Sequence, residues 1–271
     1  MSSESSLAAA GPDTRGAWMF ARYAYAPNRL GYCGPPETAT LAGVGAAAGG
    51  DVGSRDGEVR AAARRFSGAW PYLQVLARLT GISDPLDPRL VESYWLGGGV
   101  NATISSRAFG EALLEVIAPQ AGHYWTHLTP ELLDEAAGDH CFHVFGVYPW
   151  SRLLGKGMDE QPMHVLDSCR IRWGTVLSRE GDEISVSSRR LSWDGVRLGL
   201  AESSVERVRV SVGGLSFLPD VAVGDQVALH WDWLSDRLTA DQVEALEAST
   251  LRQLEATNRR LARERVSEGA R

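Results

Sequence analysis

Cysteine is the residue type in this chain best suited to chemistry, and it occurs three times, as Cys33, Cys141 and Cys169. A deprotonated thiol is both a strong nucleophile and a soft ligand for iron or zinc. An odd number of cysteines spread over this length does not form a disulfide framework. We therefore expect three free thiols, as is usual in the reducing environment of the cytoplasm.

Cys33 lies in "LGYCGPPE", a segment punctuated by glycine and proline that predicts a loop with an accessible thiol. Such a thiol could be a nucleophile or a metal ligand, or the segment could be an ordinary tight turn. No second cysteine follows two residues later, which excludes a thioredoxin-type C-x-x-C redox pair.

Cys141 lies in "HCFHVFGVYPW", between His140 and His143. On a strand Cys141 and His143 would share one face, whereas a helix would place the two histidines on the same side. The segment could contribute Cys141 and His143 to a zinc or iron site, or it could be an aromatic core segment with incidental histidines.

Cys169 precedes the alternating run "CRIRWGTVL", and we expect it to open a strand. Asp167 would raise the pKa of this thiol, whereas Arg170 and Arg172 would lower it. His230 ends a later strand, "GDQVALH". The alternative is that Cys169 is a small buried hydrophobic residue and that His230 merely terminates its strand.

The order of these features resembles the HypC-type family of small chaperones, which help to assemble the iron centre of nickel–iron hydrogenases. The resemblance covers about 90 residues, from the strand-opening Cys169, through a Gly-Asp turn and "GDQVALHWDW", to the amphipathic helix "DRLTADQVEALEASTLRQLE". It implies that Cys169 holds an iron carrying cyanide and carbonyl ligands, with His230 close by. Family members begin with Met-Cys, whereas here a long segment precedes the cysteine.

Hydrophobic periodicity predicts an α+β protein with two domains. Residues 1–160 are expected to be helical, with a disordered tail at 1–12, a first helix that ends at Pro27, a Gly/Ala-rich loop at 42–57 and a kink at Pro71. Residues 161–271 are expected to form a small antiparallel, OB-like β-barrel, closed by a helix that starts near Thr239. Tight turns are expected at Asp194-Gly195 and Gly224-Asp225.

Composition restricts the function classes. A net charge of −7 without a long basic run argues against nucleic-acid binding. The N-terminus lacks the pattern of a signal peptide, and no stretch approaches the about 18 apolar residues of a membrane helix. We therefore expect a cytoplasmic protein without membrane insertion.

The leading hypothesis is an accessory factor in [NiFe]-hydrogenase maturation, a carrier or chaperone more than an enzyme, with the hydrogenase large subunit or other maturation proteins as partners. Its cargo would be a transient Fe(CN)2CO group, and Trp231 and Trp233 would form a docking surface. One alternative is a thiol-dependent transferase or hydrolase with a cysteine nucleophile and a histidine base. Another is a non-catalytic interaction scaffold. The candidate metal ligands are Cys169, His230, Cys33, Cys141 and His143.

Overall fold

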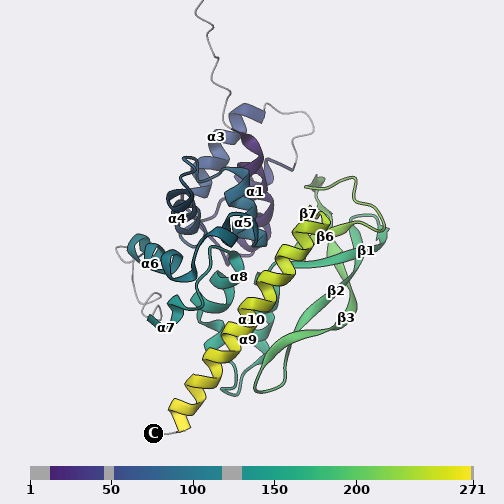
Figure 1. Cartoon of the computed structure of the whole chain (residues 1–271). Coiled ribbons are helices and arrows are strands. Elements are labelled where there is room, and N and C mark those ends of the chain that lie inside the picture. The colour runs from purple at the N-terminus through teal and green to yellow at the C-terminus, as the bar shows by residue number, and fades with distance from the viewer. Residues whose placement is uncertain (1–12, 46–51, 118–129, 270–271) are drawn as a thin grey trace, which may run out of the picture.

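The computed structural model describes residues 13–45, 52–117 and 130–269. Among the described residues, the elements as far as residue 169 are helices and helical turns, strands follow as far as residue 237, and a long helix comes after them (Figure 1). The helices and helical turns before the strands are α1 (Thr14–Arg29), α2 (Thr38–Ala42), α3 (Val52–Ala63), α4 (Trp70–Thr80), α5 (Pro88–Leu96), η1 (Gly99–Thr103), α6 (Ser106–Ile117), α7 (Pro130–Leu133), α8 (His140–Phe142), η4 (His143–Val147), η5 (Pro149–Leu153) and α9 (Glu160–Cys169).

The strands form one main sheet that closes on itself in the order β1-β2-β3-β7-β6. Antiparallel pairing joins β1 to β2, β2 to β3, β6 to β7 and β6 back to β1. The remaining junction, between β3 and β7, is a single parallel pair, Arg209 with Trp233. The strands are β1 (Arg172–Glu180), β2 (Glu183–Trp193), β3 (Leu198–Arg209), β6 (Gln226–His230) and β7 (Trp233–Arg237), with a small hairpin of β4 (Ser211–Val212) and β5 (Leu215–Ser216) outside this sheet.

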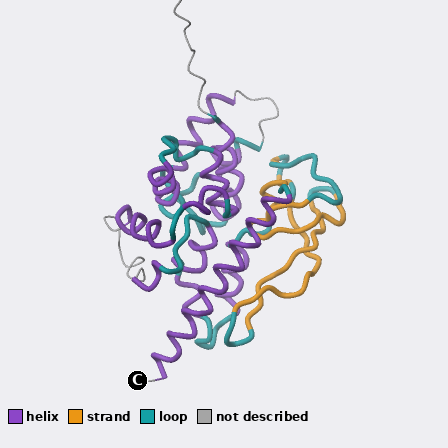
Figure 2. Tube along the Cα trace, in the orientation of Figure 1, coloured by secondary structure: helices purple, strands orange, loops and turns teal. Residues whose placement is uncertain are grey.

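The last helix, α10 (Ala240–Gly269), lies between the helical part and the sheet (Figure 1). It contacts α5, α8 and η4 on one side and β3 on the other. Figure 2 shows the helices gathered on one side of the molecule and the strands on the other. Thr239 and Gln242 exchange hydrogen bonds through side chain and backbone, which is a capping box at the start of α10.

Two apolar cores hold these elements together. The larger core extends from α1 through the helical part to residues of α9, α10 and the sheet, including Leu191 and Trp233. The smaller core fills the interior of the sheet with valine, isoleucine and leucine side chains. The larger core runs across residue 160, the expected domain boundary, and helix α9 (Glu160–Cys169) lies after that residue, so the strands begin only at Arg172.

The α+β class, the final helix and the two tight turns are confirmed. The strands are not purely antiparallel, because β3 and β7 pair in parallel. Helix α1 continues two residues past Pro27, and the expected loop at 42–57 is wrong over its last part, where α3 begins at Val52. Pro71 causes no kink because it lies in the first turn of α4, where its missing N–H needs no partner. Residues 1–12 and 46–51 lie outside the described residues.

Among the described helices, none is both long enough and apolar enough to cross a membrane.

Candidate functional site: a cavity lined by two cysteines

Cys169 is the last residue of α9 and does not open a strand, so that prediction was wrong. Val165, Leu166 and Cys169 recur at helical spacing, and all three are buried in the larger core. The end of the helix is fixed through its carbonyls. The Trp231 N–H donates to the Ser168 carbonyl at 2.9 Å, and His140 Nε2 donates to the Cys169 carbonyl at 3.0 Å.

A cavity of about 420 Å³ lies beside this helix end. Cys33, from the loop between α1 and α2, and His143, from η4, line it together with Cys169. Val147 and Val165 form an apolar part of the cavity wall. Tertiary structure thus brings three of the five predicted ligand residues to one enclosed space, although they come from three distant segments.

The loop that carries Cys33 is held by one buried side chain, Asn28. Its Nδ2 donates to the carbonyls of Cys33 at 2.8 Å and Pro35 at 2.7 Å, and its Oδ1 accepts from the Glu37 N–H at 3.1 Å. Gly34 has a φ of 72°, a conformation that disfavours any side chain. The Cys-Gly-Pro segment is therefore a rigid turn that places its thiol at a fixed position.

Desolvation keeps both thiols protonated at neutral pH, although Cys33 as a residue is only half-buried, whereas Cys169 is buried. Desolvation raises the pKa of Cys33 to about 12. Burial also raises the pKa of Cys169 to about 12, and negative charge on Cys33 adds to this rise, while the Trp231 side chain acts in the opposite direction. This effect of Cys33 on Cys169 agrees with their positions on the wall of one cavity. A thiol of such a high pKa is a weak nucleophile until its proton is lost.

The imidazole ring of His143 forms part of the cavity wall. The residue is 2% exposed, and its Nδ1 has no hydrogen-bond partner among the described residues. Burial lowers the pKa of His143 to about 3, so the ring is neutral. Its Nε2 faces Gly68, where a Cβ atom would lie only 2.9 Å away.

The other two predicted ligands, His230 and Cys141, do not line this cavity. His230 Nδ1 donates to the Tyr23 carbonyl at 2.7 Å, and its ring lies 5.4 Å from that of His140. Burial lowers the pKa of His230 well below its ordinary value, which the Cys169 carbonyl partly opposes. The Cys141 Sγ contacts the Thr250 hydroxyl at 3.6 Å, beside α10. His230 thus lies near the Cys169 backbone, whereas Cys141 packs against Thr250 of α10.

Trp231 and Trp233 are buried, so neither ring forms an exposed docking surface in this conformation. Trp231 is 7% exposed and stacks on Tyr32 with ring centroids 4.2 Å apart, whereas Trp233 is fully buried against Tyr25. Trp231 also has a φ of 57°, which is uncommon for a large side chain and occurs here in the turn between β6 and β7. Trp231 supports one wall of the cavity, since Tyr32 is among its lining residues.

One ion pair, between Asp167 and Arg190, joins α9 to β2, and two other pairs lie beside it. Asp167 pairs with Arg170 at 3.0 Å and with Arg190 at 2.9 Å, and Arg172 pairs with Glu206 at 3.2 Å. Burial tends to raise the pKa of Asp167, but Arg170 and Arg172 outweigh it, so this pKa is lowered. Asp167 therefore anchors the helix end that carries Cys169.

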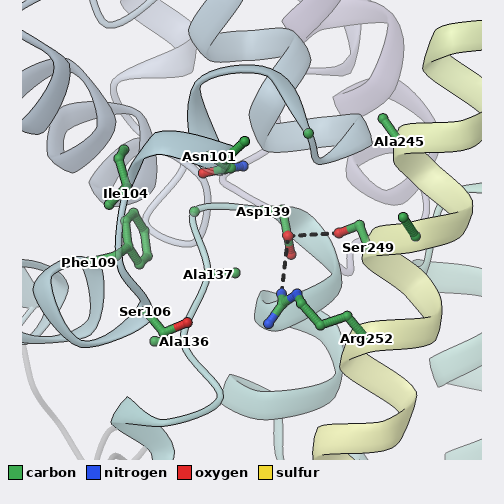
Figure 3. A pocket seen from close by; sticks show the side chains of 14 residues that line it. Asn101, Ile104, Ser106, Phe109, Ala136, Ala137, Asp139, Ala245, Ser249 and Arg252 are labelled. Carbon is green, nitrogen blue, oxygen red and sulfur yellow. Dashed lines mark hydrogen bonds and ion pairs between the residues drawn. The ribbon is translucent and has the colours of Figure 1, made fainter.

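A second cavity, of about 320 Å³, lies between α6, the segment before α8, and α10. Figure 3 shows that Asp139 points toward Ser249 and Arg252 of α10. The carboxylate accepts from Ser249 Oγ at 2.7 Å, from Arg252 at 3.3 Å and from the Phe142 N–H at 2.9 Å. No cysteine or histidine lines this cavity.

Within the described ranges, no three histidine, cysteine or acidic side chains converge in a way that could hold a metal ion. The predicted set of five ligands is therefore not one preformed centre. His140 and Asn28 are important supports that the sequence-based list of site residues did not include. Asn28 carried no recognisable signal, whereas the H-x-x-H spacing placed His140 beside His143 if the segment was helical, as it is.

Fold and site define an α+β protein whose helical part contains a cavity lined by two cysteines. The chain belongs to DUF6390, a family of unknown function, which it matches over residues 12–264. No curated protein and no solved structure matches it.

Proposed function

We propose that this protein is an accessory factor in [NiFe]-hydrogenase maturation, in which Cys169 carries an iron bearing cyanide and carbonyl ligands. The observation that carries the proposal is the placement of Cys169 at the wall of a cavity, with His230 close to its backbone. This is the pairing of cysteine and histidine that the resemblance to HypC-type chaperones implies. The strand order and the helix that follows it also agree with the small barrel and closing helix expected from that resemblance.

The chemistry of the cavity suits a carrier. A thiolate is a soft, electron-rich ligand for low-spin Fe(II), and a site with few protein ligands releases its metal more easily than a closed cage of four. The high pKa of Cys169 favours release as well, because the departing iron is replaced by a proton. The partners in this proposal are the hydrogenase large subunit or other maturation proteins, and the setting is the cytoplasm.

The alternative of a thiol enzyme receives less support. A cysteine nucleophile needs a base within hydrogen-bond reach. Among the described residues no cysteine Sγ is hydrogen-bonded to a histidine, and burial lowers the pKa of the cavity histidine, His143, to about 3, which makes it a weak base.

Infrared spectroscopy on protein purified without oxygen, after co-expression with the iron-cyanide assembly machinery, tests the proposal. Wild type is expected to have cyanide and carbonyl stretching bands, and Cys169→Ala is expected to lose them. Cys141→Ala is the matched control, because it removes a buried thiol that does not line the cavity. A folded wild-type protein without these bands would overturn the carrier function.

A further inference from the structure

We infer that a small basic cavity beside the C-terminal half of α10 binds a phosphate group. This cavity, of about 80 Å³, is separate from the cysteine cavity and from the cavity lined by Asp139. It lies where α10 meets η5, the turn that follows η5, and the turn between β2 and β3. The inference goes beyond the proposed function and is independent of it, because the site involves neither the thiols nor the cargo.

The lining of this cavity carries more positive than negative charge. Arg152, Lys156 and Arg265 are its cationic residues, Glu264 is its one acidic residue, and the others are glycine and leucine. Positive side chains gathered in a hollow with apolar walls raise the local concentration of anions. A phosphate group carries up to two negative charges, and a guanidinium can bond two of its oxygens at once. The lining therefore suits a phosphate better than a singly charged anion.

Two of the arginines are held in place by backbone carbonyls, which leaves part of each guanidinium for a ligand. Arg152 Nη1 donates to the Gly146 carbonyl at 3.0 Å. Arg265 Nη2 donates to the Val196 carbonyl at 2.6 Å, and its Nη1 donates to the Gly195 carbonyl at 3.5 Å. Each guanidinium has five N–H groups, so these bonds use only some of them. Two guanidiniums fixed in this way are preorganised for an oxyanion.

The Glu264 carboxylate only partly neutralises the arginines beside it. Arg152 Nε lies 3.9 Å and Arg260 Nη1 lies 3.6 Å from Glu264 Oε1, both beyond hydrogen-bond distance. The Arg260 side chain is 5% exposed, and its Nη1 has no hydrogen-bond partner among the described residues.

The charge of Arg152 is disfavoured by its surroundings. Burial lowers the pKa of Arg152, and the positive charge of Arg260 lowers it further, whereas Glu264 and Glu135 act in the opposite direction. A bound anion would supply the negative charge that these two arginines lack and would stabilise both. The position of the cavity next to them is thus the one where an anion gains most.

The size of the cavity limits the ligand. A water molecule occupies about 30 Å³ in the liquid, so the volume of about 80 Å³ holds a group of a few heavy atoms. Free phosphate would lie wholly inside, whereas a phosphate monoester would place its organic part toward the solvent. In either case the phosphate would connect η5, the β2–β3 turn and α10, which are far apart in the sequence.

Isothermal titration calorimetry with inorganic phosphate, at about pH 8 and constant ionic strength, tests the site. Arg152→Gln should weaken binding by about tenfold, because it removes charged hydrogen-bond donors. Glu264→Gln should strengthen binding by about threefold or more, because it removes the one negative charge in the lining. Arg179→Gln is the matched control, since Arg179 also donates to backbone carbonyls, those of Pro219 and Val221, but does not line this cavity.

Two results would overturn the inference. One is a folded wild-type protein that does not bind phosphate at concentrations up to about 10 mM. The other is a Glu264→Gln variant that binds no more tightly than wild type, which would mean that phosphate is attracted by the general surface. Because the Glu264→Gln result is a gain in affinity, it decides the question even if Arg152→Gln does not fold.

Phosphoserine in place of inorganic phosphate identifies the source of the group. Phosphoserine that binds at least as tightly as phosphate, and loses affinity in Arg152→Gln, would assign the site to a phosphorylated molecule. Binding of inorganic phosphate with exclusion of phosphoserine would assign the site to the free ion. Both results support a phosphate site, and phosphoserine binding that is equally strong in wild type and in Arg152→Gln would contradict it.

Discussion

The two cavities differ in how their polar side chains are satisfied. In the cavity beside α10, Asp139 is bonded on every side, to a hydroxyl, a guanidinium and a backbone N–H (Figure 3). In the cysteine cavity the supporting hydrogen bonds go to the carbonyls of Cys33 and Cys169, while His143 Nδ1 has no partner among the described residues. The Asp139 carboxylate is fully used by these contacts, which is typical of a structural joint, whereas Asn101 Oδ1 in the same cavity lacks a hydrogen-bond partner among the described residues. In the cysteine cavity the hydrogen bonds fix the backbone at Cys33 and Cys169 and do not use the two thiols.

Thiol labelling gives the largest expected effect. In a Cys141→Ala background, the pKa of about 12 at Cys33 and Cys169 should slow alkylation near neutral pH by about a thousandfold relative to the unfolded chain. The measurement is the rate of iodoacetamide incorporation followed by mass spectrometry, in buffer and in denaturant. Labelling at the rate of an ordinary exposed cysteine would mean that the cavity thiols are solvated, and the contrast between the two cavities would disappear.

Acid should destabilise the cysteine side of the molecule first. Burial lowers the pKa of His140 to about 4 and that of His143 to about 3, and it also lowers that of His230. As pH falls from 6.5 toward 4, these histidines therefore become protonated in the unfolded chain but stay neutral in the folded chain. The free energy of unfolding decreases as a result. From pH 7.5 to 5.5 the three histidines together should cost about 4 kcal/mol.

Urea unfolding across this pH range measures the effect, and His143→Phe should remove about a third of it, or about 1.4 kcal/mol. An unfolding free energy that stays constant from pH 7.5 to 5.5 would contradict the burial of neutral imidazoles around Cys169.

Asp139→Ala should destabilise the protein by about 2–3 kcal/mol, because it removes the acceptor of Ser249 Oγ, one of the acceptors of Arg252 and the N-cap of α8. Asp139→Asn retains a good cap and should cost about half as much. Denaturant midpoints report both values. If this cavity is a structural joint, Asp139→Asn should leave the infrared bands unchanged. Loss of the bands in this variant would show that both cavities take part in the function.

Gly68→Ala should have the smallest effect, a loss of about 1 kcal/mol, since the added Cβ would lie 2.9 Å from His143 Nε2. The imidazole should shift, with a change in its NMR resonances. Gly57→Ala is the matched control, because its Cβ would meet nothing within 4 Å in the middle of α3, and there alanine should be neutral or stabilising. Equal effects of the two substitutions would contradict close packing of His143 at the cavity wall.

Local pattern predicted much of the fold. The alternating run after Cys169 corresponds to β1, the turn expected at Asp194-Gly195 joins β2 to β3, and the helix expected to start near Thr239 begins at Ala240. The strand β7 was not predicted, because the turn before it uses Trp231 and Asp232 where glycine or asparagine would be expected. The buried face of β1 carries Arg172, Gly174 and Val176, and a buried arginine is predictable only when its partner, Glu206, is known.

The candidate site was predicted as separate parts. The thiols and the histidines stood out by residue type, but nothing in the spacing of Cys33, His143 and Cys169 indicates that they share a cavity. Their proximity depends on how α1, η4 and α9 pack in the larger core, which is a long-range property. Cys169 was assigned to a strand because the alternating run after it was the stronger signal, whereas helix α9 carries a proline, Pro162, near its start.

The position of α10 bears on how the chain folds during synthesis. This helix is made after α5 and α8, against which it packs and which precede it by about a hundred residues or more in the sequence. The helical part consequently leaves the ribosome with one side of its core uncovered, and it stays so until α10 has emerged. Contacts between residues so far apart also slow folding. A nascent chain stalled before residue 240 should therefore bind general chaperones, and should release them once α10 has been added.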